Sequence, residues 1–180
     1  FLELARFETK GQTFDLEHDL SAYAPPERVD ASGFEFRRAK DQDMGAILEF
    51  FASEFPLRWC YDIRAKMEVE GADTVFGMFE GDRCHGFSLL QDWSGCELPI
   101  GGAVWHLDLG EKWGSLGPIG ISKEVRGRGL GDALLRESLL DLKARGAQKT
   151  IIDWTNLFDF YGAHGFTVAR TYDQLFLDLQ

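Results

Sequence analysis

The chain has 180 residues, of which 44% are hydrophobic and 27% are charged, so it can bury a core and is not expected to be disordered. Its 30 acidic and 19 basic residues leave a net charge of −11, which argues against nucleic acid or an anionic membrane surface as a partner. The sequence also contains no apolar run near the roughly 20 residues that a membrane-spanning helix needs.

The first 23 residues contain two short apolar stretches, at 1–7 and 14–16, with a Lys-Gly-Gln turn candidate at 10–12. Alternation of apolar and polar residues on either side of a glycine turn predicts a β-hairpin over 1–23. Two adjacent prolines then interrupt any regular structure, so we interpret 24–32 as a linker. A separate domain is expected from 33 to 180.

The domain is expected to open with a strand at 34–38 and a helix that Asp41 caps. Pro56 ends this helix, and a second helix is predicted from 58 to about 70, where Gly71 stops it. Apolar residues three and four apart mark one face of the first helix, and they are Met44, Ile47, Leu48, Phe51 and Phe55.

Two strands are predicted at 74–79 and 84–90, because a Gly-Asp pair between them suits a tight hairpin turn. The segment from 92 to 112 is rich in glycine and is interpreted as a long loop with a short strand at 104–107. Long loops inside compact domains are often functional.

A strand at 116–122 is expected to lead into a glycine-rich turn and then into the clearest helix of the chain, which Gly146 ends. Leucines at 130, 134, 135, 139 and 142 form its apolar stripe. Two pairs of opposite charges, each four residues apart, are expected to form along its surface, Asp132 with Arg136 and Asp141 with Arg145.

The remaining chain predicts a strand at 150–152, a short helix at 156–163 and two terminal strands at 166–169 and 175–177. The sum is an α/β (α+β) domain in which hairpin-linked strands precede and surround a central helical crossover.

The glycine-rich turn is the strongest functional signal. A helix N-terminus has unpaired N–H groups and a partial positive charge, and glycines before it let an anion approach the backbone. The spacing matches neither a dinucleotide-binding Gly-x-Gly-x-x-Gly turn nor a P-loop. It matches [Gln/Arg]-x-x-Gly-x-[Gly/Ala], in which Arg126, Gly129 and Gly131 occupy the specified positions.

In this respect the sequence resembles the GCN5-related N-acetyltransferase (GNAT) superfamily, over about 33–179 and most sharply over 116–166. The resemblance implies a central mixed, mostly antiparallel sheet, splayed in the middle and flanked by helices. It also implies acetyl-CoA as acyl donor, with pantetheine pairing along one strand and pyrophosphate bound at the turn. The implied contacts are Ile119, Gly120 and Ile121 for pantetheine, and Arg126, Gly127, Arg128, Gly129, Leu130, Gly131 and Asp132 for pyrophosphate.

A second family motif, Tyr-x-x-x-Gly-Phe, is matched by residues 161–166. The resemblance implies that Tyr161 gives a proton to the leaving thiolate, which is plausible because a phenol pKa of about 10 is not far from a thiol pKa of about 8.5. The family pattern has Asn seven residues before this Tyr, where this chain has Trp154. Asn156, five residues before it, is the substitute that we assign to cofactor binding.

The general base is not specified by the resemblance. Some members carry a Glu on the strand that corresponds to 113–122, and this chain has none there. We expect Asp153, just past the fifth strand of the family fold, to point into the cleft where the sheet splays. A water relay and a carboxylate or histidine in the preceding loop, from among His106, Asp108 and Glu111, remain alternatives.

The leading hypothesis is therefore an N-acetyltransferase that transfers acetyl directly to a primary amine, with a small-molecule acceptor that the sequence does not identify. Trp59 and Tyr61 flank the junction of the first two helices, which borders the acceptor in this superfamily. The alternative is a coenzyme A-binding but catalytically idle half of a tandem GNAT protein.

Three observations bear on the setting of the protein. Cys60, Cys84 and Cys96 have no metal or redox spacing, so reduced thiols, no metal and a cytoplasmic location are expected, with the chain a monomer or homodimer. The chain opens at Phe1 without an initiator Met. Because 5–16 can be aligned with 169–179, we interpret 1–23 as the tail of a preceding GNAT repeat.

Overall fold

The computed structural model describes residues 7–27, 30–98 and 105–177, which form one seven-stranded sheet with helices on both faces. The strand order is β2-β3-β4-β5-β6-β1-β7, and every neighbouring pair is antiparallel except β5 with β6. This arrangement confirms the predicted fold class. The strands are β1 (Glu8–Asp19), β2 (Glu35–Arg38), β3 (Val75–Glu80), β4 (Arg83–Asp92), β5 (Trp113–Ile121), β6 (Lys149–Thr155) and β7 (Thr167–Phe176).

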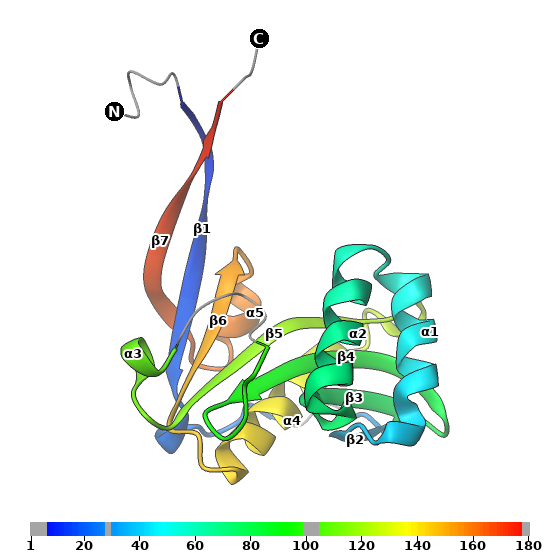
Figure 1. Ribbon diagram of the computed structural model, residues 1–180. Helices are drawn as coiled ribbons and strands as arrows, with labels where there is room; N and C mark the ends of the chain where they lie inside the picture. Colours follow the sequence, from blue (N-terminus) through cyan, green and yellow to red (C-terminus); the bar gives the residue numbers. More distant parts are fainter. Residues whose placement is uncertain (1–6, 28–29, 99–104, 178–180) are drawn as a thin grey trace.

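The helices cover the sheet from two sides. The α-helices are α1 (Met44–Glu54), α2 (Arg58–Glu70), α3 (His106–Leu109), α4 (Leu130–Ala144) and α5 (Phe158–Gly162). Short 3-10 turns occur at Leu20–Ala22, Asp41–Asp43, Ala72–Thr74 and Lys123–Val125. In Figure 1, α1 and α2 lie together on one side of β3 and β4, and α4 lies on the other. Among the described residues, no helix combines the length and apolarity needed to cross a membrane.

Two apolar clusters hold these layers together. The five leucines of the α4 stripe are completely buried, as predicted, and pack against Leu90 of β4 and Leu116 of β5. On the opposite face, Phe51 of α1 packs on Phe87 of β4, with ring centroids 4.4 Å apart. The sheet is therefore buried on both faces along its central strands.

The predicted surface ion pairs of α4 are wrong, because both carboxylates and one of the two arginines bond to other elements. Asp141 binds Arg38 of β2 at 2.7 Å, and Arg145 binds Asp92 at the end of β4 at 2.8 Å. Asp132 accepts a hydrogen bond from His164, and Arg136 pairs with Glu137. Sequence spacing alone could not reveal these partners, because the fold brings them in from distant segments.

The predicted N-terminal hairpin is also wrong for the described residues. β1 runs straight through the expected turn at 10–12 and pairs with β6 on one side and β7 on the other. Its residues Leu16 and Leu20 belong to the main core. The origin of 1–23 in a preceding repeat stays a prediction, and residues 1–6 lie outside the described residues.

Two further predictions need correction. The strand expected at 104–107 falls partly outside the described residues, and its described part forms a turn at Trp105 and the start of helix α3. The two terminal strands are a single strand, β7, whose pairing with β1 extends from Thr167 to Phe176. A long antiparallel partner can keep a chain extended through polar residues that look like a turn in sequence.

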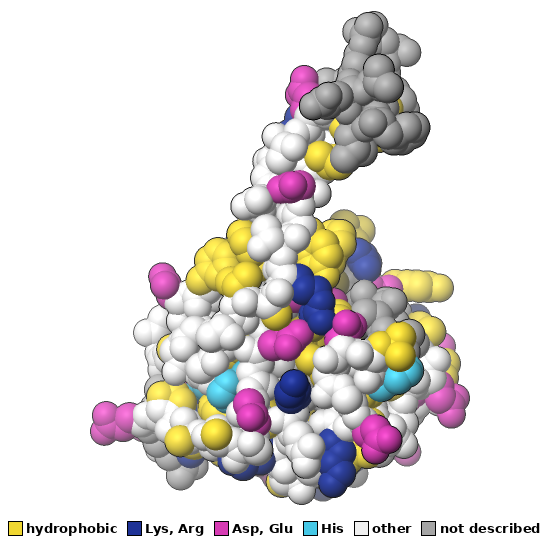
Figure 2. Space-filling view, turned by 90° about the vertical axis from the view of Figure 1, so that its left-hand side faces the viewer, with side chains coloured by type: hydrophobic (Ala, Val, Ile, Leu, Met, Phe, Trp, Pro, Cys, Tyr) yellow, Lys and Arg dark blue, Asp and Glu magenta, His cyan; other side chains and the backbone are white. Residues whose placement is uncertain are grey.

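β1 and β7 rise together from the body as a long two-stranded ribbon (Figure 1). Hydrophobic side chains gather on both sides of the base of this ribbon (Figure 2). Exposed apolar residues of β7, of the start of α5 and of the turn before it include Leu157, Phe158, Val168, Tyr172, Leu175 and Phe176.

Leu16→Ala tests whether β1 is an integral part of the core. Leu16 is 2% exposed, so truncation should lower the free energy of unfolding by about 2–5 kcal/mol. Val168→Ala, on the facing position of β7 but 51% exposed, should cost less than about 1 kcal/mol. Urea denaturation measures both, and equal small effects would show that β1 does not stabilise the domain.

Candidate active site

The site begins where β5 and β6 separate. Their parallel pairing ends at Ser115 and Ile151. Beyond this point β5 stays paired with β4 as far as Ile121, while β6 pairs with β1 as far as Thr155. Each strand thus follows its outer neighbour, and the expected splay of the sheet is confirmed.

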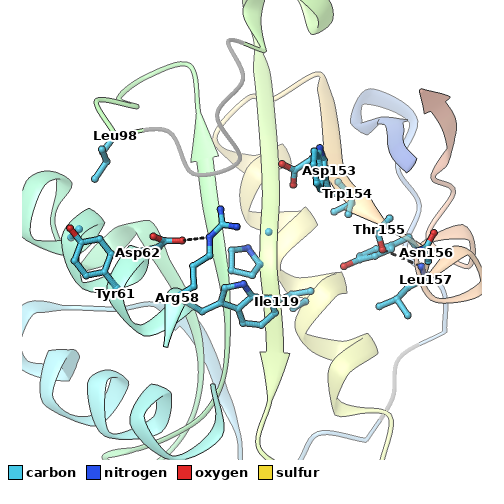
Figure 3. Close-up of a pocket in the computed structure, with 16 residues that line it drawn as sticks. Arg58, Tyr61, Asp62, Leu98, Ile119, Asp153, Trp154, Thr155, Asn156 and Leu157 are labelled. Atoms are coloured by element: carbon cyan, nitrogen blue, oxygen red, sulfur yellow. Dashed lines mark hydrogen bonds and ion pairs between the residues drawn. The ribbon is translucent and has the colours of Figure 1, made fainter. Parts of the chain in front are cut away.

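The splay opens into a cavity of about 870 Å³. It lies between α2 on one side and the end of β6 on the other, with β5 along its floor (Figure 3). Four predicted site residues meet here, namely Ile119, Asp153, Asn156 and Tyr161. The remaining lining residues are Arg58, Trp59, Tyr61, Asp62, Ala65, Leu98, Gly117, Pro118, Ile152, Trp154, Thr155 and Leu157.

Asp153 occupies the point of the splay. Its carboxylate points toward β5 in Figure 3, and Oδ1 lies 3.7 Å from where a Cβ atom would stand on Gly117. Burial raises the pKa of this carboxyl, and the negative charge of Asp15 on β1 raises it further. His106, Asp108 and Glu111 are not among the lining residues of the cavity. Of the carboxylates and the histidine considered from the sequence, Asp153 is thus the one that lines the cavity, and its pKa is raised.

Tyr161 lies on α5 and is 4% exposed. Burial raises the pKa of its phenol to about 12, with a smaller contribution from the charge of Asp153. The ring of Phe166 packs against it at a centroid distance of 5.9 Å, and the Phe166 N–H bonds to the Tyr161 carbonyl oxygen. These contacts explain the motif, since the Gly-Phe pair folds back and fixes the Tyr ring.

The glycine-rich turn lies between two buried anchors, Val125 and Leu130, while residues 126–129 are exposed. Gly127 and Gly129 have φ values of 77° and 74°, a left-handed conformation that residues with a Cβ atom rarely adopt. Gly129 is the N-cap of α4, so the turn delivers the chain directly into the helix N-terminus.

Gly131 does not share the left-handed conformation of Gly127 and Gly129. A Cβ atom added there would meet Ile121 of β5 at 3.8 Å and Phe160 of α5 at 4.0 Å, which are ordinary contacts. Neither its backbone nor its neighbours therefore require glycine. The same contacts show that the start of α4 adjoins the end of β5, which places the predicted pyrophosphate and pantetheine segments side by side.

The side chains around the turn contact other residues of the protein. Arg126 donates to the Ile121 carbonyl oxygen at 3.4 Å, and the Arg128 guanidinium lies 5.4 Å from the Phe34 ring centroid. The Asp132 carboxylate bonds His164 at 2.9 Å, and His164 bonds the Tyr23 hydroxyl at 2.7 Å. The part of Asp132 left for an anion is therefore its backbone N–H.

Asn156 also has a local role. With its amide nitrogen turned toward them, it donates to the carbonyl oxygens of Gln12 and Thr155, both at 3.2 Å. This amide joins β1 to the turn that precedes α5. Its assignment to cofactor binding stays a prediction.

The opposite wall of the cavity comes from α2, and here the sequence analysis identified only Trp59 and Tyr61. Phe55 and Trp59 pack with centroids 5.2 Å apart, and Phe55 lies so close to Gly120 that a Cβ atom there would meet its ring at 2.5 Å. Arg58 and Asp62 bond to each other at 3.2 Å across one helical turn. Their spacing is that of an ordinary surface pair, so no sequence signal marked them.

A buried ion pair fixes the rim of this wall. Lys66 is completely buried, bonds Glu70 at 2.7 Å and donates to the carbonyl oxygen of Leu98 at 2.8 Å. Glu70 in turn accepts the Leu98 N–H at 2.7 Å. Leu98 lines the cavity, so this pair holds one edge of the site.

The family model described as Acetyltransferase (GNAT) family matches residues 44–166. Among curated proteins, mycothiol acetyltransferase of Corynebacterium glutamicum (strain R) is 43% identical over 58 residues, which are 30% of this chain and 20% of that protein.

Two solved structures extend the comparison. The GCN5-related glucosamine N-acetyltransferase region of a fungal multi-domain GH3 β-N-acetylglucosaminidase is 25% identical with a TM-score of 0.85, covering 94% of this chain and 21% of that one. A GNAT family acetyltransferase from Brucella melitensis in complex with acetyl-CoA is 20% identical with a TM-score of 0.52, covering 72% and 81%, and shares the fold. The chain spans about a fifth of the curated relative and of the fungal protein.

Asp153→Asn should stabilise the protein at neutral pH. The folded-state pKa of Asp153 is raised, so the folded chain binds its proton more tightly than the unfolded chain does. The ionised carboxylate therefore costs stability as pH rises through the folded pKa, and this cost is absent below the unfolded pKa of about 3.9. Urea denaturation should show the gain at pH 7 and its loss near pH 3. Asp173→Asn, an exposed carboxylate on β7, is the control, and an equal gain there would contradict the assignment.

Proposed function

Because the chain belongs to the acetyltransferase (GNAT) family, we propose that it transfers the acetyl group of acetyl-CoA directly to the primary amine of a small molecule, and that this molecule is an amino sugar. The observation that carries the proposal is the meeting of Asp153 and Tyr161 in one cavity at the splay of β5 and β6. Acetyl-CoA is the acyl donor of this family.

The residues around the splay fit acetyl-CoA. The first N–H groups of α4, a helix of 15 residues, have no intrahelical partner and carry partial positive charge. The turn before them is exposed, and nothing lies within 4 Å of where a Cβ atom would stand on Gly127, which leaves open space where a pyrophosphate needs close backbone approach. Ile119, Gly120 and Ile121 present the edge of β5 that faces away from β4, which suits pantetheine.

Acetyl-CoA supplies an acetyl thioester, whose carbonyl carbon forms a C–N bond with the acceptor nitrogen while the C–S bond breaks. We assign Asp153 as the base that takes the proton from the acceptor nitrogen. Its raised pKa makes it a better base than an exposed Asp, and it must be ionised to act, so activity should fall at acidic pH. We assign Tyr161 as the donor that protonates the leaving sulfur, and its raised pKa keeps the phenol protonated across the working range.

The choice of an amino sugar is supported by the cavity and by one comparison. Tyr61 and Trp154 are strongly exposed around the cavity and offer flat aromatic faces, while Asp62 and Asp153 supply negative charge. An amino sugar has an ammonium group, which suits a carboxylate or an aromatic face, and hydroxyls that form hydrogen bonds. The fungal structure of the comparison is itself named a glucosamine N-acetyltransferase region.

The alternative of a catalytically idle, coenzyme A-binding half is not favoured. The cavity keeps a buried Tyr and a partly buried carboxylate, both with raised pKa values, and such groups cluster at catalytic sites. Both the family model and the curated relative are named for acetyltransferase activity.

Gly131→Glu tests the pyrophosphate assignment without disturbing the fold. Glutamate has a higher helix propensity than glycine, and a negative charge in the first turn favours the helix. The same charge should repel pyrophosphate and raise the Kd of acetyl-CoA by more than roughly tenfold, about 1.4 kcal/mol. Isothermal titration measures this, with Gly131→Ala as the matched control that should bind as the wild type does. Wild-type affinity in Gly131→Glu would place the pyrophosphate elsewhere.

Tyr161→Phe tests the catalytic assignment with glucosamine as acceptor. Thiol release from acetyl-CoA should occur with glucosamine and not with N-acetylglucosamine, whose amine is blocked. The substitution should lower kcat by about 10²–10⁴-fold with little change in KM. Because the phenol pKa is about 12, the difference should persist to about pH 10. Acetylation of a polyamine or a peptide N-terminus but not of glucosamine would refute the amino sugar, and no acetylation of any amine would refute the function.

A further inference from the structure

An irregularity in the pairing of β1 with β6 lies directly at the site. The register pairs Phe14 with Thr155 and Leu16 with Ile152. Between these pairs β1 has one residue, Asp15, while β6 has two, Asp153 and Trp154. Two residues opposite one define a β-bulge, a feature that often re-aims side chains next to active sites.

The bulge requires an unusual backbone at Trp154. Its φ value is 49°, in the left-handed region that residues other than glycine seldom adopt. Such a conformation persists where the surrounding structure holds it. The contacts of the Trp154 backbone therefore identify what holds the bulge.

Asp15 makes that contact. Its side chain is 1% exposed, and Oδ1 accepts the Trp154 N–H at 3.1 Å. Oδ2 accepts the Tyr172 hydroxyl at 2.7 Å, with the Arg170 guanidinium at 3.8 Å. The Tyr172 ring also lies against the Trp154 indole, with centroids 6.3 Å apart at 30°. Two strands from opposite ends of the chain thus hold one residue of β6.

The two residues of the bulge line the cavity. Successive residues of a regular strand point to opposite faces of the sheet. Asp153 and Trp154 are successive, yet both line the same cavity, and Figure 3 shows them together on its β6 side. Ile152 and Thr155, on either side of this pair, line the cavity as well, so the cavity follows β6 along the whole bulge.

We propose that Asp15 is a positioning residue for the acetyl transfer inferred above, because its carboxylate holds the Trp154 N–H and so maintains the bulge from which Asp153 and Trp154 line the cavity. This inference rests on the proposed function for its kinetic consequence. Asp15 and Tyr172 both lie outside residues 44–166, which the family model matches.

The charge of Asp15 has a second effect on the site. After burial, it is the next cause of the raised pKa of Asp153. Other titratable or charged groups also face the two carboxylates. On the β1 side they are Tyr161 of α5, Arg170 and Tyr172 of β7, and Asp108 of α3, which bonds to Arg170. Across the cavity they are Arg58, Tyr61 and Asp62 of α2. Removing the Asp15 charge alone should therefore move the titration of Asp153 to lower pH.

Two substitutions separate the two effects. Asp15→Asn removes the charge but keeps an oxygen that can accept the Trp154 N–H. Asp15→Ala removes both. Asp173→Asn is the matched control, since Asp173 is an exposed carboxylate of the same ribbon that bonds Gln12. Hydrogen exchange of the Trp154 amide and the carbon-13 titration of the Asp153 carboxyl, assigned with Asp153→Asn, are measured by NMR in each chain.

In Asp15→Ala we expect faster exchange of the Trp154 amide and a loss of kcat on the order of 10²-fold, with acetyl-CoA affinity retained. In Asp15→Asn the amide should stay protected, while the Asp153 titration and the acidic limb of kcat/KM shift to lower pH. Asp173→Asn should behave as the wild type in all respects.

Unchanged exchange and kcat in Asp15→Ala would overturn the proposal, and an unchanged Asp153 titration in Asp15→Asn would overturn the effect of the Asp15 charge. Should Asp15→Ala fail to fold, the wild type still decides, because a Trp154 amide that exchanges as fast as an amide without a hydrogen bond would overturn the proposal. Should the wild type acetylate no amine, the proposed function fails, but the two NMR measurements continue to test whether Asp15 holds the bulge and the charge of Asp153.

Discussion

The parting of β5 from β6 is the constraint on which the rest of the site depends. Each strand is drawn to its outer neighbour, β5 to β4 and β6 to β1, and Pro118 has no N–H with which to continue the ladder between them. A sheet that opens in this way exposes backbone groups and side chains that would otherwise face a paired strand. The cavity, the approach to α4 and the facing positions of Asp153 and Tyr161 all follow from it.

The N-terminal strand is what makes this parting stable. β1 pairs with the edge of β6 that faces away from β5, contributes Leu16 to the core and supplies Asp15 to the bulge. A segment that precedes the family-matched residues therefore acts both in the packing of the domain and in the shape of its site. The Asn156 amide, which joins β1 to the turn before α5, adds a second tie at the same point.

The site concentrates groups that are unfavourable for stability. Asp153 is partly buried near a second carboxylate, and Trp154 has a left-handed backbone. Both features cost folding free energy. Such a combination is typical of a functional site, and the apolar clusters on both faces of the sheet offset its cost in folding free energy.

The sequence by itself determined the elements that depend on neighbours along the chain. The α4 stripe, the end of α2 at Gly71, the β3–β4 hairpin and the glycine-rich turn all follow from local spacing, and the family resemblance followed from that turn and from the Tyr-x-x-x-Gly-Phe motif. Only the tertiary structure decided features that join distant segments. The straight course of β1, the partners of Asp141 and Arg145, and the bulge opposite Asp15 depend on contacts across most of the chain, because strand pairing and ion pairing select partners by position in space and not by spacing in sequence.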